Sequence, residues 1–420
     1  MKPGIALVIF ILLMSLVTGC EKNKDDQSKI KDDNFLQALI ELGVDSNNDH
    51  KISPDEAEGW KTLEIPSKQI SNLSGIELFK DLEVLGCSGN GLSTLDLSEN
   101  TNLRSLDCSG NQLILLDLSE NDTLYSLNCS NNILANLDIS GCPELIYLYC
   151  SHNYLKALDF SKNPLLSTIE CDFNRLSILD IPLNSNLQSL ECSYNQLTNF
   201  SIPDNAKFTY LSCNNNNLTS LDVSKCPELV LLHCFKNSLS ALDLSKNLAL
   251  DNLGCHSNQL TNLDVSNNKS LRLLYCYDNQ LTTLDVSGNP DLKALGCDGN
   301  PLTSLDVSAN LLLDNLRINN NMLLTSIDLS KNAELSILFC GKTGLTSLDI
   351  SKNPKMTYLN CDGDMLTTLD ISHNPMLTSL YIRDMPELHK VCVPVMPIPT
   401  GFLIETSGSP NVYLTTDCAK

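Results

Sequence analysis

Leucine and cysteine recur along most of the chain at a constant interval. The unit L-x-x-L-x-C-x-x-N, as in residues 103–111, returns every 21 residues, and a second unit, L-x-x-L-D-V-S-x-N, as in residues 302–310, follows it. Inside each unit apolar and polar residues alternate, which is typical of a short strand with one buried face. A fixed period of this length predicts a solenoid whose turns pack only against their neighbours.

The alternation predicts which side chains form the core. Leu106 and Cys108 point inward in the first unit, and Leu305 and Val307 do so in the second. Each turn then has two short strands, so the stacked turns form two parallel sheets. We expect about sixteen turns and a rod of roughly 75 Å, because parallel strands lie about 4.8 Å apart. The inner position of the first unit, which we call the ladder position, is a cysteine in thirteen turns: Cys87, Cys108, Cys129, Cys150, Cys171, Cys192, Cys213, Cys234, Cys255, Cys276, Cys297, Cys340 and Cys361.

These units, each closed by an asparagine, resemble the leucine-rich-repeat family over roughly residues 60–385. The first stretch, from Trp60 to Leu82, is similar to the repeat of bacterial internalins. The resemblance implies a leucine-rich-repeat solenoid with little helix. Residues 34–59 are expected to form a small helical cap before it, and residues 386–420 an irregular cap after it, because a solenoid needs both ends covered.

Residues 1–19 have the form of an export signal. Lys2 precedes an apolar run over residues 5–17, which is too short to span a bilayer. Val17 to Cys20 looks like a bacterial lipobox, which implies acylation of Cys20 and a flexible tether over residues 20–33; an ordinary cleaved signal is the alternative. Residues 24–26 resemble the surface-export signal of Gram-negative lipoproteins. We therefore expect a lipid anchor in the outer membrane and exposure on the cell surface.

The formal charge of −22 argues against nucleic acid or anionic lipid headgroups as partners. Much of this charge comes from an aspartate that recurs in the second unit, from Asp96 to Asp370, interrupted by Ser201. A uniform column has little with which to discriminate ligands. We interpret it as a solvated structural ladder, with a cation-accumulating surface as the alternative.

Residues 45–56 match the spacing of an EF-hand calcium loop between two short helices, expected over residues 34–42 and 54–60. His50 departs from the pattern, because the family has glycine at this turn. The alternative is a loop that is merely rich in Asp and Asn. We expect one calcium ion, held by Asp45, Asn47, Asp49, the Lys51 carbonyl, Ser53 and Glu56.

The cysteines do not predict catalysis. Alternation turns Cys234 inward and its neighbour His233 outward, so the two cannot form a nucleophile and base pair. Cysteines stacked in parallel are poorly suited to disulfide geometry and are interpreted as small apolar core residues. Cys392 and Cys418 lie outside the ladder and are expected to form a disulfide in the oxidising export route. No outward acid, base and nucleophile converge, so we do not expect an enzyme.

Outward positions beside the ladder carry seven of the eleven tyrosines. Exposed aromatic and arginine side chains contribute much of the binding energy at interfaces. We expect a monomer that recognises a protein partner on this face, with Tyr210, Phe235, Tyr275 and Tyr277 as one patch; the alternatives are a glycan ligand on the same face and a purely structural role. The expected recognition residues are Tyr147, Tyr149, Tyr210, His233, Phe235, His256, Tyr275, Tyr277, Arg317, Phe339, Tyr358, Tyr381 and Arg383.

Overall fold

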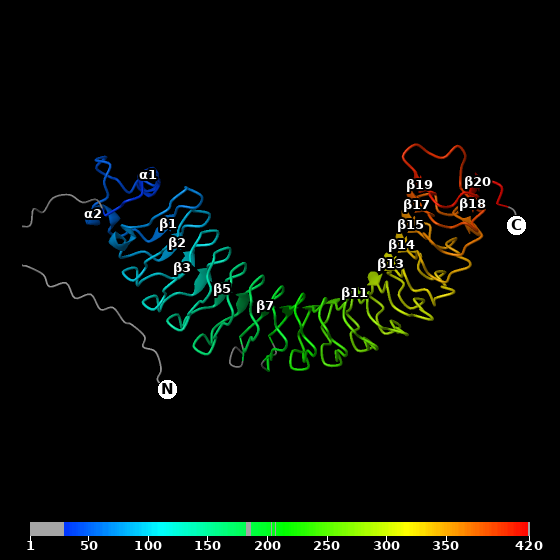
Figure 1. Ribbon diagram of the computed structural model, residues 1–420, viewed down its shortest axis with the longest axis horizontal. Coiled ribbons are helices and arrows are strands. Elements are labelled where there is room, and N and C mark those ends of the chain that lie inside the picture. Colours follow the sequence, from blue (N-terminus) through cyan, green and yellow to red (C-terminus); the bar gives the residue numbers. More distant parts are fainter. Residues whose placement is uncertain (1–28, 182–185, 203, 206, 419–420) are drawn as a thin grey trace, which may run out of the picture.

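The computed structural model describes residues 29–181, 186–202, 204–205 and 207–418. In these residues the chain winds into a curved solenoid, with the helical cap at one end and the C-terminal turns at the other (Figure 1). The predicted leucine-rich-repeat solenoid with a 21-residue period is confirmed. The export signal, Cys20 and most of the predicted tether lie outside the described residues.

One parallel sheet of 17 strands runs along the inner, concave side of the curve (Figure 1). Each strand has three residues, and the middle one is a leucine or isoleucine. Neighbouring strands pair in register, so that Leu106 lies beside Leu127. The strands are β1 (Thr62–Glu64), β2 (Val84–Gly86), β3 (Ser105–Asp107), β4 (Ser126–Asn128), β5 (Tyr147–Tyr149), β6 (Thr168–Glu170), β7 (Ser189–Glu191), β8 (Tyr210–Ser212), β9 (Leu231–His233), β10 (Asn252–Gly254), β11 (Leu273–Tyr275), β12 (Ala294–Gly296), β13 (Asn315–Arg317), β14 (Ile337–Phe339), β15 (Tyr358–Asn360), β17 (Ser379–Tyr381) and β19 (Leu403–Glu405).

Rows of leucine and cysteine form the core. All thirteen ladder cysteines are fully buried free thiols. Burial raises the pKa of the Cys129 thiol to about 12, so this group stays protonated. The thiols therefore serve as small apolar side chains that fill the space behind each strand.

Asparagine side chains join consecutive turns at the bends. Asn111 donates from Nδ2 to the carbonyl oxygens of Cys87 and Cys108, at 3.1 and 3.0 Å. Its Oδ1 accepts the N–H of Leu92 at 3.0 Å. A second buried column, which includes Asn100, donates in the same way on the other side of the core. These amides form the hydrogen bonds that the buried backbone groups at the bends cannot make with water.

The aspartate column lies on the opposite side of each turn and is mostly irregular. The Ser98 N–H donates to Asp96 Oδ1 at 3.1 Å, and the same local bond recurs from turn to turn, so the chain bends soon after each aspartate. In the described residues, regular pairing on this side is confined to the C-terminal end, where β16 (Thr368–Asp370), β18 (Lys390–Cys392) and β20 (Tyr413–Thr415) form a three-stranded sheet. Two isolated bridges, Asp159 to Asp180 and Asp180 to Ser201, occur earlier on the same side.

The N-terminal cap consists of two helices, α1 (Asp33–Glu41) and α2 (Pro54–Ala57), followed by the 3-10 helix η1 (Ile76–Leu78) in the first turn. Asp32 caps α1 by accepting the N–H of Phe35 at 3.0 Å, and it also accepts the Ser71 hydroxyl at 2.7 Å, which ties the cap to the solenoid. Phe35 is fully buried in the shared core. No helix in the described part of the chain is long and apolar enough to cross a membrane.

The C-terminal region, expected to be irregular, continues the solenoid. β19 pairs with β17 in the long sheet, and β18 and β20 extend the three-stranded sheet. Cys392 and Cys418 form a disulfide with their Cα atoms 5.6 Å apart, which is the pair expected from the sequence.

Candidate functional site

The outward side chains of the 17-stranded sheet form the concave face. On each turn the first and last strand residues and the residue after the ladder position point outward. In β11, Leu273 and Tyr275 flank the buried Leu274, and Tyr277 follows Cys276. All thirteen residues expected to carry recognition hold such positions.

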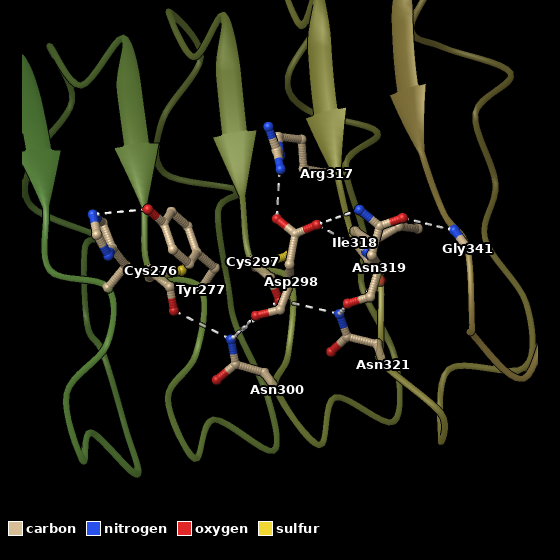
Figure 2. A network of polar contacts seen from close by, with 11 residues as sticks. Cys276, Tyr277, Cys297, Asp298, Asn300, Arg317, Ile318, Asn319, Asn321 and Gly341 are labelled. Carbon is tan, nitrogen blue, oxygen red and sulfur yellow. Dashed lines mark hydrogen bonds and ion pairs between the residues drawn. The ribbon is translucent and has the colours of Figure 1, made fainter. Parts of the chain in front are cut away.

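A column of stacked rings occupies the middle of the concave face. Phe235 stacks on His256 with ring centres 4.3 Å apart, and His256 stacks on Tyr277 at 3.9 Å. The Tyr277 hydroxyl lies 3.0 Å from His256 Nε2 (Figure 2), and His256 Nδ1 lies 3.2 Å from the Ser257 hydroxyl. Burial lowers the pKa of His256 to about 4, so the ring is neutral at pH 7.

Two glycines make room for the neighbouring rings. A Cβ on Gly296 would lie 2.9 Å from Cδ1 of Tyr275 and 3.7 Å from Cδ1 of Tyr277. A Cβ on Gly254 would lie 3.1 Å from Cδ2 of His233. Tyr275 of β11, Tyr277 just after that strand and His233 of β9 therefore lean along the sheet over the next turn. The absence of a side chain at these two positions permits this arrangement.

Tyr210 belongs to a different group from the stacked rings. β6 and β7 pair Glu170 directly with Glu191, and Asp172 follows on the same face. Burial, together with the charges of Glu191 and Glu170, raises the pKa of Asp172 to about 7. The pKa of Tyr210 is raised by its own burial and by Glu191. Tyr210 therefore lies against carboxylates.

Of the four residues predicted as one patch, three come together. Phe235 and Tyr277 sandwich His256, and Tyr275 lies beside Tyr277 over Gly296. Further along the sheet Phe339, Tyr358 and Tyr381 form a second aromatic group, with ring centres 4.6 and 5.3 Å apart. Arg317 lies over Phe339, and Arg383 lies over Tyr381.

Asp298 anchors a polar network between these two aromatic groups (Figure 2). Its Oδ1 accepts Nδ2 of Asn319 at 2.6 Å, and Arg317 Nε lies 3.5 Å from Oδ2. Asn319 Oδ1 then accepts the Gly341 N–H at 2.8 Å. Asp298 is 8 % exposed, and its burial raises its pKa. Sequence reasoning included Arg317 but missed Asp298 and Asn319, which occupy the position after the ladder where the preceding turns carry rings.

A third aromatic column on the edge of the sheet was also missed. His152, Phe173 and Tyr194 stack with ring centres 4.3 and 4.2 Å apart. Each lies two residues after the ladder position, in a turn with φ between +52 and +56°. Strand alternation ends at such a residue, so it could not place these side chains. Arg175 covers Tyr154 beside them.

The structure of one solved protein carries both the fold and the ladder. The functional domain of InlJ from Listeria monocytogenes, which includes a cysteine ladder, is 34 % identical to this chain. The match covers 86 % of this chain and 74 % of that one, with a TM-score of 0.70. The chain belongs to the internalin-like leucine-rich-repeat proteins.

Other solved structures share the fold with this internalin-like protein. A leucine-rich-repeat protein of Leptospira interrogans is 23 % identical, over 74 % of this chain and 80 % of that one, with a TM-score of 0.60. YopM from Yersinia enterocolitica is 19 % identical, over 94 % and 96 % of the two chains, with a TM-score of 0.65. No protein-family model and no curated protein sequence match the chain.

In the N-terminal cap of this internalin-like protein, the loop between α1 and α2 folds acidic side chains onto its own backbone. Asp45 accepts the N–H groups of Asp49 and His50 at 3.2 and 3.0 Å, and Asn47 accepts the Asp49 N–H at 2.8 Å. His50 has a φ of +60°. It thus takes the left-handed conformation that the resemblance assigns to glycine, and the loop closes despite the substitution.

Glu56 bridges the two ends of this loop. Its Oε1 accepts the Ser46 N–H and its Oε2 the Ser53 N–H, both at 3.0 Å. Hydrogen bonds from the Ser53 backbone and hydroxyl lower the pKa of Glu56 to about 2, so the carboxylate is ionised. With Asp45, Asn47, Asp49, Ser53 and the Lys51 carbonyl it supplies only oxygen donors, the kind that a hard cation such as calcium prefers. The carboxylate oxygens of Asp45, Asp49 and Glu56 do not all lie within 4.8 Å of one another, so the loop has the donor chemistry of the site and not its closed geometry.

One group of potential metal ligands lies at the other end of the described residues. A carboxylate oxygen of Asp370 and the sulfurs of Cys392 and Cys418 are within 4.8 Å of one another, and no other such cluster of His, Cys, Asp or Glu occurs in the described residues. The two sulfurs are bonded to each other and offer no thiolate. We therefore assign a structural role to this group.

Proposed function

We propose that this protein recognises a protein partner through its concave face. The observation that carries the proposal is the unequal distribution of side chains on the two sides of the solenoid. The aspartate side repeats Asp and Ser from turn to turn, whereas the concave face carries tyrosine, phenylalanine, histidine and arginine in a pattern that changes along the sheet. Variation of this kind gives a surface the means to distinguish one partner from another.

The centre of the proposed interface is the ring column with Tyr275 beside it. Phe235, His256 and Tyr277 hold one another by stacking, and the hydrogen bond to His256 fixes the Tyr277 hydroxyl. Rings that are already ordered lose little freedom on binding. Tyrosine also combines a large apolar surface with one polar group, which suits a protein interface.

We infer that the protein is a binding protein without catalytic activity. Cys234 is fully buried, whereas His233 next to it faces outward, so the pair cannot act together. Asp298, the most deeply buried carboxylate of the concave face outside the asparagine column, is engaged by Arg317 and Asn319.

Two serine hydroxyls lie beside a histidine, Ser257 at 3.2 Å from Nδ1 of His256 and Ser372 at 3.1 Å from Nδ1 of His373. Each of these pairs is formed by chain neighbours, and the other nitrogen of His256 is bonded to the Tyr277 hydroxyl instead of to a carboxylate that would orient a base.

We further propose that Cys20 carries a lipid that anchors the protein in the outer membrane, with the solenoid exposed at the cell surface. This part of the proposal rests on the sequence of residues 1–26 alone. The oxygen-lined loop of residues 45–56 is proposed to bind one calcium ion and to stabilise the cap next to the first turn. We expect a monomer.

The test is capture of partners by the immobilised full chain from host-cell and neighbouring-cell extracts. One half of each extract is treated with protease and the other with periodate, which oxidises sugars. A protein partner predicts that specific capture is lost after protease and kept after periodate. Capture that survives protease and is lost after periodate would replace the protein partner with a glycan, and no specific capture from any extract would leave only a structural role.

A further inference from the structure

A cavity of about 470 Å³ opens near the C-terminal end of the concave face, apart from the central ring column. The residues that line it include Asn319, Lys342, Asn360, Asp362, Arg383 and Asp384. Gly341 also lines it, and a Cβ there would lie 2.7 Å from Asn360 Oδ1 and 2.8 Å from the Asp362 carbonyl oxygen. Only glycine therefore lets these polar groups approach so closely. The volume is that of a small-molecule site.

The polar groups of this cavity are held in fixed directions. Asn360 donates from Nδ2 to Asp362 Oδ2 at 3.1 Å, and Arg383 donates from Nε to the same oxygen at 2.9 Å. On the other side Asn319 is fixed between Asp298 and Gly341 (Figure 2). Side chains locked by such bonds form a pre-organised set of donors and acceptors.

The charges of the cavity balance. Lys342 and Arg383 contribute two positive charges, and Asp362 and Asp384 contribute two negative ones. Arg383 is already paired with Asp362, whose Oδ2 lies 2.5 Å from Nη2. An ionic ligand would have to compete with this pair, whereas a neutral ligand rich in hydrogen-bonding groups would not.

Aromatic side chains border the cavity on the same sheet. Tyr381 precedes the inward Ile382, and Arg383, which lines the cavity, has its guanidinium carbon 5.4 Å from the Tyr381 ring centre. Tyr358 and Phe339 continue the aromatic surface over the two preceding strands. These rings adjoin the cavity through Arg383 and are not among the residues that line it.

We propose that this cavity binds a neutral carbohydrate residue. Sugar hydroxyls both donate and accept, which matches the alternating amide, carboxylate and guanidinium groups of the lining, and a sugar chain longer than the cavity would reach the adjoining rings. The site is distinct from the central ring column and goes beyond the proposed recognition of a protein. A carbohydrate carried by that partner and a free glycan share this chemistry.

The test uses the purified full chain on a printed array of neutral, sialylated and sulfated oligosaccharides, followed by titration of the strongest neutral oligosaccharide. The Asn360→Ala variant removes an amide that lines the cavity, and we expect affinity to fall about tenfold, the effect of one hydrogen bond to a polar ligand. Asn128→Ala is the matched control: Asn128 holds the same position in β4, and its Oδ1 accepts a backbone N–H at 3.1 Å, as Asn360 Oδ1 does. We expect the control to bind like the unaltered chain.

Three results would overturn the proposal. They are an array with no bound neutral glycan, binding restricted to sialylated or sulfated glycans, and equal affinity of Asn360→Ala and Asn128→Ala. Unfolding curves show whether either variant has lost its fold. If Asn360→Ala has, the titration is repeated with Asn360→Gln. Failure here leaves the protein-partner proposal intact, because that proposal is tested by protease-sensitive capture. Binding of the captured partner before and after removal of its glycans shows whether the carbohydrate is carried by the partner or is a free glycan.

Discussion

The hydroxyl of Tyr277 lies 3.0 Å from Nε2 of His256, and the two rings stack at 3.9 Å. Because the imidazole is neutral, Nε2 accepts from the tyrosine when Nδ1–H donates to the Ser257 hydroxyl. One histidine thus orders the side chain at the centre of the proposed interface. With a second proton on the ring both nitrogens would donate, and the Tyr277 hydroxyl would have to accept instead.

Acid should therefore weaken the fold around His256. Its pKa is about 4 in the folded chain, below the ordinary 6.5, because of burial. The unfolded chain takes up a proton first as the pH falls, so stability is full above pH 6.5 and declines between pH 6.5 and 4. A His256→Phe variant keeps the stack without titrating, and we expect its melting temperature to fall less over this range. Equal losses in both proteins would contradict this role of His256.

Asp364 replaces asparagine in the column that joins the turns. It is 4 % exposed; Oδ1 accepts the Thr343 N–H and hydroxyl at 2.7 and 2.8 Å, whereas Oδ2 has no hydrogen-bond partner. At the regular position Asn321 donates to two carbonyl oxygens, which a carboxylate cannot do. Burial raises the pKa of Asp364 to about 7, and Asp362 and the Cys340 thiol also face it.

Asp364→Asn is expected to stabilise the protein at alkaline pH. The folded pKa is raised above the unfolded value, so the stability present below pH 4 is lost as the pH rises to about 7. Asparagine restores a donor, and we expect a gain of roughly 1–3 kcal/mol at pH 8 and a smaller gain at pH 4.5. The measurement is chemical unfolding at both pH values. Asn321→Asp, the reverse change at a regular position, should lose stability at pH 8, and a gain there would refute the argument.

Calcium is expected to stabilise the N-terminal cap. An ion that binds only the folded state adds about 2.7 kcal/mol at 100 times its dissociation constant. Melting curves recorded after chelation and after return of calcium should differ for the unaltered chain and coincide for Asp45→Ala, which removes the carboxylate that accepts two backbone N–H groups. Identical responses of the two proteins to chelation and to calcium would contradict the proposed calcium site.

Cys392 and Cys418 are expected to be oxidised in freshly purified protein, and the ladder cysteines reduced. The ladder thiols are fully buried and point the same way on successive turns. Cys392 and Cys418 lie on two different segments that bring their Cα atoms to 5.6 Å. Peptide mapping without reduction checks both statements. Free thiols at the C-terminal pair would contradict the assignment, and oxidised ladder cysteines would contradict the fold.

Most of the fold could be predicted from the sequence, because the ladder positions repeat with a fixed period and strand alternation separates inward from outward residues. The same rule placed Tyr275 and Tyr277 on the concave face. It failed where the chain leaves the strand. Phe173 projects from a left-handed turn, and the aspartate side forms a regular sheet only at the C-terminal end of the described residues.

Contacts between turns were also beyond sequence reasoning. Tyr210 holds an outward position, as predicted, yet its paired residue on the preceding strand is Ser189, and the nearby Glu191 carboxylate acts on it instead of a ring. The sequence pattern does not single out Asp298, whereas in the structure Arg317 and Asn319 of the next turn surround it. Such pairings depend on which residues adjacent turns happen to carry, and no single repeat contains that information.

The most direct test of recognition on the concave face is the affinity of two face variants for a captured partner. Tyr275→Ser with Tyr277→Ser alters the concave face, and Asp264→Ser with Asp285→Ser alters the aspartate side of nearby turns. We predict that the first pair weakens binding by about 2 kcal/mol or more, roughly 30-fold, with an unchanged fold, whereas the second pair binds like the unaltered chain. Loss of binding only in the aspartate variant would show that the partner uses the opposite side.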